Sequence, residues 1–264
     1  MADVMADVMA DMRNGHTMGK PVIDARQLRV SAGPHTLLHG VDLVVAAGER
    51  VALVGHNGAG KSTLLRALTG FGRVSGGVLQ VLGTDLSTPC TPARLRQLRS
   101  RVAQVHQGLH LVGRLTALDN VLIGGAGRHP SAWTWLRRWP AADTQAALAA
   151  LVSVGLGRAA GQRSDTLSGG ERQKVAIARA LHQRASVLLA DEPTASLDTH
   201  AADDLIHLLA GVVQARQTTL VCVVHDLDLL PRLANRVVAL RQGRVVADGP
   251  VTADTPDQLR GLLR

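Results

Sequence analysis

One stretch near residue 60 has the composition of a loop that binds phosphate. It reads Gly55-His56-Asn57-Gly58-Ala59-Gly60-Lys61-Ser62 and follows the pattern G-x-x-x-x-G-K-[ST]. Its glycines let successive backbone N–H groups turn toward phosphate oxygens, and a helix predicted over Lys61–Thr69, with Thr63 in its first turn, adds its positive end. Lys61 is placed to reach the β- and γ-phosphates, and the Ser62 hydroxyl to hold Mg²⁺. The segment therefore predicts binding of a nucleoside triphosphate.

A pair of carboxylates follows the apolar run Val187–Ala190, which fits a buried strand. Asp191 suits a water-mediated contact with Mg²⁺, and Glu192 suits a position beside the water that attacks a phosphate. The chain has 18 Asp but only three Glu, so a Glu at this position is unusual for its composition. The pair predicts hydrolysis; a solvated surface pair is the alternative.

A third polar segment, Leu167-Ser168-Gly169-Gly170-Glu171, precedes the strong helix formers of Arg172–Leu181. Ser168 is a natural N-cap, because its hydroxyl can accept from the first free N–H groups of a helix. Capping alone would explain the segment, and a contact with a nucleotide is the competing interpretation.

Three apolar runs must position these groups. Val51–Val54 leads into Gly55, Val187–Ala190 into Asp191, and Leu220–Val224 into His225. Short continuous apolar runs fit strands of a parallel sheet that helices cover on both faces. Ligands bind beyond the carboxyl ends of such strands, which is where the polar residues stand.

The remaining pattern divides the chain into further parts. Edge strands with turns at Gly33-Pro34 and Ala47-Gly48 are predicted near residues 28–43, and a helical lobe near 108–165. The first twelve residues repeat a four-residue unit, so we expect residues 1–20 to be a disordered leader. Residues 21–264 then form one nucleotide-binding domain.

Composition limits the classes of function. With 46% hydrophobic and 19% charged residues the chain is globular, and no apolar run is long enough to span a bilayer. The net charge of +8 suits nucleic acid or an anionic membrane surface. One Phe, three Trp and no Tyr offer little for stacking bases, which disfavours nucleic acid. The two distant cysteines, Cys90 and Cys222, predict no disulfide framework.

The order of these motifs resembles that of ATP-binding cassette proteins, over residues 21 to about 259. The phosphate loop comes first, Ser168–Glu171 about a hundred residues later, and the carboxylate pair about twenty residues after that. Ser196-Leu197-Asp198 and His225 continue the match, and Gln107 occupies the place of the family's Q-loop glutamine.

The resemblance implies an α/β fold: a P-loop NTPase (RecA-like) parallel-sheet core with an inserted helical lobe and a small antiparallel β subdomain. It implies an ATP hydrolase that uses ATP and Mg²⁺ and works as a homodimer, in which Ser168 and Gly170 of one subunit meet the γ-phosphate held by Lys61 of the other. The implied roles are catalysis for Glu192, His225 and Gln107; metal binding for Ser62, Asp191 and Gln107; and nucleotide contact for Ser168, Gly169, Gly170 and Asp198.

Within the family, the chain is most similar to phosphonate-import ATPases. The segments that carry this likeness are Leu111–Leu122, Ser131–Trp133, Pro140–Asp143 and Val237–Gly243. It implies an importer subunit on the cytoplasmic face of the cell membrane, with integral-membrane permease subunits and a periplasmic or surface solute-binding protein as partners. The alternatives are another importer (phosphate or amino acid), a non-transport ATPase acting on nucleic acid, and a nucleotide sensor without turnover.

The chain departs from the family pattern at two places. Glu171 stands where the signature usually has Gln, and Ala32 occupies the place of the aromatic residue that stacks on adenine. His35, three positions later, is the candidate substitute. Without stacking, discrimination between bases would be weak.

Two further features have open interpretations. Trp133, Trp135 and Trp139 lie close together and suit either a contact surface or core packing. The basic run from Arg94 to Arg101 suits a solvated face or, less directly, lipid headgroups.

Overall fold

The computed structural model describes residues 21–128, 139–195 and 197–263. The leader predicted at residues 1–20 lies outside the described residues. The chain divides into two compact units: the first comprises the chain up to Cys90 together with Val223 onward, and the second is Thr91–Cys222. Each unit is described by itself below.

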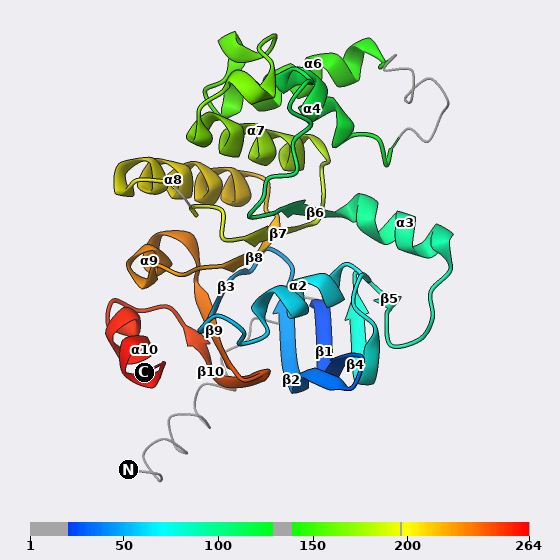
Figure 1. The fold of residues 1–264 in the computed structure, drawn as a ribbon, viewed down its shortest axis with the longest axis vertical. Helices are drawn as coiled ribbons and strands as arrows, with labels where there is room; N and C mark the ends of the chain where they lie inside the picture. The colour runs from blue at the N-terminus through cyan, green and yellow to red at the C-terminus, as the bar shows by residue number, and fades with distance from the viewer. Residues whose placement is uncertain (1–20, 129–138, 196, 264) are drawn as a thin grey trace. The chain divides into compact units, whose positions relative to one another are not determined.

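The first unit contains an antiparallel sheet that follows the predicted edge strands. Its strands lie in the order β2-β1-β4-β5 and comprise β1 (Pro21–Ala32), β2 (His35–Ala46), β4 (Val74–Val81) and β5 (Thr84–Asp85) (Figure 1). The turn at Gly33-Pro34 joins β1 to β2, and that at Ala47-Gly48 follows β2, so both predicted turns are confirmed. Alternate residues of β1 face the core until a bulge at Gln27, where φ is 48°.

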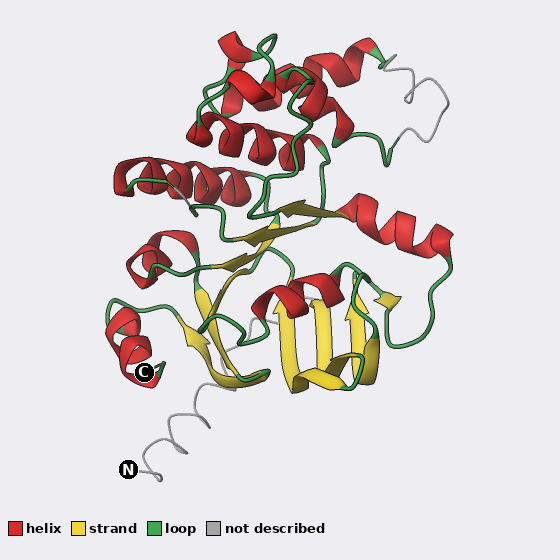
Figure 2. Cartoon of the chain, in the orientation of Figure 1, coloured by secondary structure: helices red, strands yellow, loops and turns green. Residues whose placement is uncertain are grey.

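The same unit contains the strand that delivers the phosphate loop. β3 (Arg50–Val54) pairs parallel to β9 (Arg236–Arg241), and β9 pairs antiparallel to β10 (Arg244–Pro250). Residues Val51–Val54 are 0% exposed, which confirms the prediction of a strand covered on both faces. The helical segments of this unit are α2 (Lys61–Leu68), η4 (Leu227–Leu229), α9 (Leu230–Leu233) and α10 (Thr255–Leu262) (Figure 2).

A buried ionic network holds β9 against its neighbours. The Arg236 guanidinium, 8% exposed, donates to both carboxylate oxygens of Asp248 at 2.6 Å and to Glu49 Oε1 at 3.0 Å. It also donates to the carbonyl of Val44 at 2.7 Å. One side chain thus joins β10, the end of β2 and the approach to β3.

The second unit combines parallel strands with a group of helices. β6 (Val102–Val105) pairs parallel to β7 (Val187–Asp191), and β8 (Thr219–Val223) lies next to β7 at the end of the unit. The helical segments here are α3 (Pro92–Arg101), α4 (Ala117–Ile123), α6 (Ala141–Ser153), η2 (Gly157–Ala159), η3 (Ser164–Thr166), α7 (Gly169–His182) and α8 (Thr199–Ala215). Of these, α4, α6 and α7 pack on one another.

Cys90 and Cys222 are free thiols, and burial raises the pKa of Cys222. Throughout the described ranges, no helix combines the length and the apolar character needed to cross a membrane.

Candidate functional site

The phosphate loop runs from the end of β3 to the start of α2, and two glycines fix its shape. Gly55 has φ of 145°, and a Cβ there would lie 2.2 Å from the carbonyl oxygen of Leu240. Gly60 has φ of 105°, and a Cβ there would lie 2.8 Å from Leu38 Cδ2. A side chain at Gly55 would clash with the backbone, and both φ values lie in a range that residues with side chains rarely adopt, so the course of the loop depends on these glycines.

Lys61 folds its side chain back over this loop. The residue is 6% exposed, and its Nζ donates to the carbonyl of Gly55 at 2.6 Å and to that of His56 at 3.0 Å. The ammonium therefore lies within the curve of the loop, at the N-terminus of α2. A positive charge combined with the N-terminus of a helix favours a polyanion such as a triphosphate.

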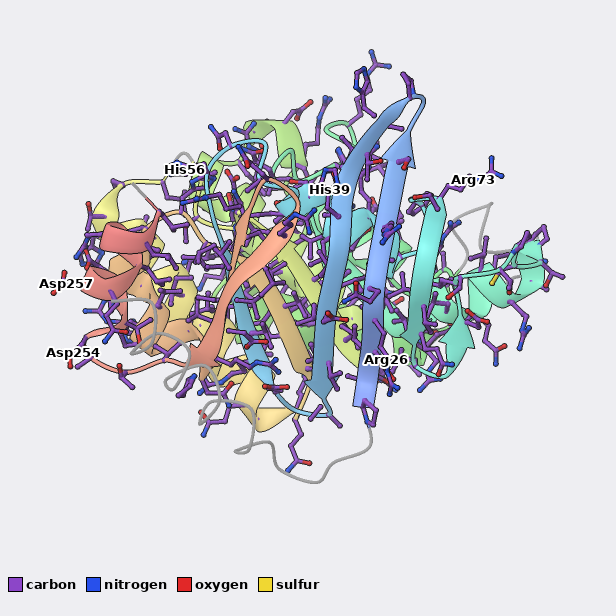
Figure 3. The ribbon with its side chains drawn as sticks, turned by 90° about the horizontal axis from the view of Figure 1, so that it is seen from below. Arg26, His39, His56, Arg73, Asp254 and Asp257 are labelled. Atoms are coloured by element: carbon purple, nitrogen blue, oxygen red, sulfur yellow. The ribbon has the colours of Figure 1, made fainter. Side chains whose placement is uncertain are left out.

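Two residues that sequence reasoning missed support the loop from outside. The N–H of Gly243, in the turn between β9 and β10, donates to the carbonyl of Ala59 at 2.9 Å. Its carbonyl accepts from the N–H of His39 at 2.8 Å. Figure 3 shows His39 beside this orange turn. Gly243 has φ of 71° and lies against the backbone of β2. The sequence does carry a signal for this turn, which is the glycine itself.

A polar pocket of about 410 Å³ opens beside the loop in the first unit. His56 forms a hydrogen bond through Nε2 with the carbonyl of Leu263, and Arg260 pairs with Asp228 at 2.6 Å. The pocket brings together the predicted residues His56, Asn57 and His225, and adds α10, which sequence reasoning had not assigned to the site. Its lining is Gly55, His56, Asn57, Val224, His225, Leu227, Arg260 and Leu263.

The expected adenine-stacking position lies at the tip of the β1–β2 hairpin. Ala32 pairs with His35 across the turn, and both residues are exposed. The role of His35 in holding a base stays a prediction.

In the second unit, Asp191 ends β7 and Glu192 follows it with an unusual backbone. Glu192 has φ of 52°, a left-handed backbone conformation that residues other than glycine rarely adopt. Gln107 Nε2 donates to Glu192 Oε2 at 3.1 Å. The fold thus joins two predicted catalytic residues that are 85 positions apart in the chain.

The loop that carries Gln107 contains two further left-handed residues. Leu109 has φ of 57° and His110 has φ of 48°, and such conformations cost about 1–3 kcal/mol each. Arg179 of α7 donates to the carbonyl of His110 at 2.8 Å and to that of Leu109 at 2.6 Å. The imidazoles of His106 and His110 lie with their centroids 4.5 Å apart. These contacts offset the strain.

The segment around Ser168 forms a complete capping box. Ser168 is the N-cap of α7: its Oγ accepts from the N–H of Glu171 at 3.3 Å. The Glu171 carboxylate in turn accepts from the N–H of Ser168 at 2.9 Å and from its hydroxyl at 2.8 Å. The backbone N–H of Ser168 and its hydroxyl lower the pKa of Glu171. The capping interpretation is confirmed, and the contact with nucleotide stays a prediction.

The other predicted groups have simpler surroundings. Asp198 caps α8 by accepting from the N–H of Ala201 at 2.9 Å, and a Cβ at Gly170 would lie 3.8 Å from Leu197 Cδ2. Among the described residues, no three His, Cys, Asp or Glu side chains gather as a metal cluster. Ser196, Trp133 and Trp135 lie outside the described residues.

The chain is similar to a protein family and to several named relatives. A family model described as ABC transporter matches residues 38–195. The chain is 46% identical over 228 residues to the phosphonates import ATP-binding protein PhnC of Cupriavidus pinatubonensis, covering 85% of this chain and 81% of the relative. It is 44% identical over 243 residues to the phosphate-import ATP-binding protein PhnC of Mycolicibacterium smegmatis, covering 92% of each.

Solved structures share the fold. The chain is similar to a dimeric post-hydrolysis state of the ATP-binding cassette MJ0796 bound to ADP and Pi, with a TM-score of 0.76 and 26% identity, covering 88% of this chain and 99% of that one. The predicted fold class, an α/β P-loop NTPase, is thereby confirmed.

Proposed function

Because this chain belongs to the ABC transporter family, we propose that it is the ATP-hydrolysing subunit of an importer for phosphonate or a related oxyanion. ATP binding and hydrolysis in a dimer would drive a separate membrane permease, which a solute-binding protein supplies. The subunit would work at the cytoplasmic face of the membrane.

The phosphate loop is the observation that carries the ATPase assignment. Gly55 leaves no room for a Cβ, and the Lys61 ammonium lies within the curve of the loop at the start of α2. Neither feature serves packing alone: a buried ammonium bonded to backbone carbonyls costs desolvation, which a bound triphosphate would offset.

We assign the remaining roles residue by residue. Glu192, with its left-handed backbone at the end of β7, acts as the base toward the attacking water, and Gln107 and His225 orient that reaction. Ser168, Gly169, Gly170 and Asp198 act on the nucleotide of the opposite subunit, and His35 lies against the base.

Oxygen ligands of the kind that Mg²⁺ prefers are available on Ser62, Asp191 and Gln107. Bound Mg²⁺ neutralises charge on the phosphate oxygens. Ser62 is the second residue of α2, and Asp191 is the last residue of β7.

A deletion strain tests the proposal. We expect the organism that carries this gene to lose growth on a phosphonate as sole phosphorus source when the gene is deleted. The parental gene should restore growth, whereas a gene encoding Lys61→Ala should not. Growth that is unaffected by the deletion, in a strain with no second such ATPase, would contradict the importer assignment.

Inorganic phosphate is the second candidate solute. The relative from M. smegmatis, which covers 92% of this chain, is named for phosphate import. Uptake of radiolabelled phosphate and of a labelled phosphonate, in the deletion strain and its parent, separates the two: only the transported solute loses its ATP-dependent uptake.

A further inference from the structure

The loop that carries Gln107 is attached to the helix that Ser168 caps. Arg179, near the C-terminal end of α7, donates through Nη2 to the carbonyl of Leu109 at 2.6 Å and through Nη1 to that of His110 at 2.8 Å. Both partners are backbone atoms of the loop, and Ser168 stands at the other end of the same helix. If the packed helix moves as a rigid element, a displacement of its N-terminus would reach the loop through Arg179.

The hydrogen bonds from Arg179 to Leu109 and His110 compensate for strained backbone. Both residues have left-handed backbones, which are costly without compensation. Arg179 is half-buried, and desolvation lowers the pKa of its guanidinium. The two carbonyls replace part of the polar contact that this charge loses with its hydration. Loop and side chain therefore hold each other in place.

The backbone geometry carries this restraint to Gln107. The N–H of Leu109 donates to the carbonyl of His106 at 2.9 Å, and the N–H of His110 donates to that of Gly108 at 2.6 Å. The first turn, from His106 to Leu109, contains Gln107, and the second, from Gly108 to His110, overlaps it; the contact between the His106 and His110 rings joins the two ends of the segment. A change at residues 109–110 would therefore alter the turn that holds Gln107, whose side-chain amide donates to Glu192 at 3.1 Å.

We propose that Arg179 is a positioning residue that links α7, the helix capped by Ser168, to the Gln107–Glu192 hydrogen bond, so that movement of α7 changes the position of the Glu192 carboxylate. The functional part of this inference rests on the proposed ATPase function. The two hydrogen bonds of the Arg179 guanidinium to the loop end on Leu109 and His110 and not on Gln107 or Glu192, so Arg179 acts through the loop.

The first test needs no nucleotide. The side-chain amide resonance of Gln107, assigned by its loss in Gln107→Ala, is followed by ¹H–¹⁵N NMR in the nucleotide-free protein. Glu192→Ala shows how the resonance shifts when the hydrogen bond is lost. We expect Arg179→Met to shift it in the same direction and Arg179→Lys, which keeps a donor, to shift it less.

Arg216→Met is the matched control. Arg216 also donates to a backbone carbonyl near the end of α7, that of Leu181 at 2.7 Å, and this bond does not involve the Gln107 loop. We expect it to leave the Gln107 resonance unchanged. The proposal is overturned if Arg179→Met leaves that resonance unchanged in a folded protein, or if Arg216→Met shifts it as much.

The second test is a double-mutant cycle on ATP turnover. If Arg179 acts through Gln107, Arg179→Met and Gln107→Ala should each lower kcat by about tenfold with KM nearly unchanged, and the double variant should be no more than about twofold slower than Gln107→Ala. A loss of about a hundredfold in the double variant would mean independent roles and would overturn the link. If the parent protein hydrolyses no ATP, the proposed function fails, while the NMR result still decides the contact.

Discussion

The phosphate loop and the loop that carries Gln107 both contain left-handed backbone, and they reach it by different means. In the first, the left-handed residues are glycines, for which the conformation costs little. In the second, they are Leu109 and His110, held by a side chain about seventy residues away in the chain. The first loop is therefore specified locally, and the second depends on tertiary contacts.

Lys61→Ala should produce the largest effect, because it removes the charge that binds phosphate while the loop keeps its glycines. Two lost charge-assisted hydrogen bonds at about 1.5–3 kcal/mol each would weaken ATP binding by about 10²- to 10⁴-fold. Isothermal titration with ATP measures this. Lys174→Ala, at another of the three lysines, is the control and should bind normally. ATP affinity within threefold of the parent (roughly 0.6 kcal/mol) would refute the role of Lys61.

Arg236→Met should destabilise the scaffold around the first loop. Breaking a buried ionic network costs about 3–5 kcal/mol, which lowers Tm by about 6–20 °C in a chain of this size. Arg26→Met is the control, since Arg26 makes a similar two-pronged contact with Asp24 at 3.0 Å but lies at the surface. Calorimetry compares the two. Equal Tm values would show that burial of the network adds nothing.

The second unit should be more sensitive to acid because of His182. Burial and the nearby Arg128 lower the pKa of His182 from 6.5 to about 4. The unfolded chain thus binds the proton first, so this contribution to stability is complete above pH 6.5 and is lost as the pH falls toward 4. The loss is at most about 3 kcal/mol.

His182→Leu should remove that part of the acid sensitivity, as measured by urea unfolding between neutral pH and mild acid. His207→Leu, at an exposed histidine of α8, should retain it. If the His182→Leu protein lost stability on acidification as steeply as the parent, another group would have to be responsible.

The same difference between local and tertiary determinants explains which features could be predicted from the sequence. The phosphate loop, the strands that end in Gly55 and Asp191, and the N-cap at Ser168 follow from local residue types, and all of them form as predicted. The Gln107–Glu192 contact and the Arg179 bonds join distant segments, and no local pattern carries them. The contribution of α10 to the pocket beside His56 was missed because it too joins segments that are distant in the sequence.

Glu171→Gln should have the smallest effect. Gln can accept the same bond from the Ser168 N–H, so the unfolding free energy near neutral pH should change by less than about 1 kcal/mol. The pKa of Glu171 is lowered in the folded protein, so the stability that its charge contributes is lost as the pH falls below the ordinary pKa of a Glu. The Gln variant should not show this loss of stability. Thermal melts at neutral and acidic pH test this; a large loss of Tm at neutral pH would show that the charge itself holds the helix.

The behaviour of Glu192→Gln tests the ATPase account most directly. The substitution keeps the size of the side chain and removes its negative charge, while Lys61 and the loop glycines are untouched. A positioned general base contributes about 10²–10⁴-fold, so ATP turnover should fall by that factor while ATP binding survives. With Mg·ATP, size-exclusion chromatography should show the variant as a stable dimer. A variant that hydrolyses ATP within a few-fold of the parent and stays monomeric with Mg·ATP would contradict the account.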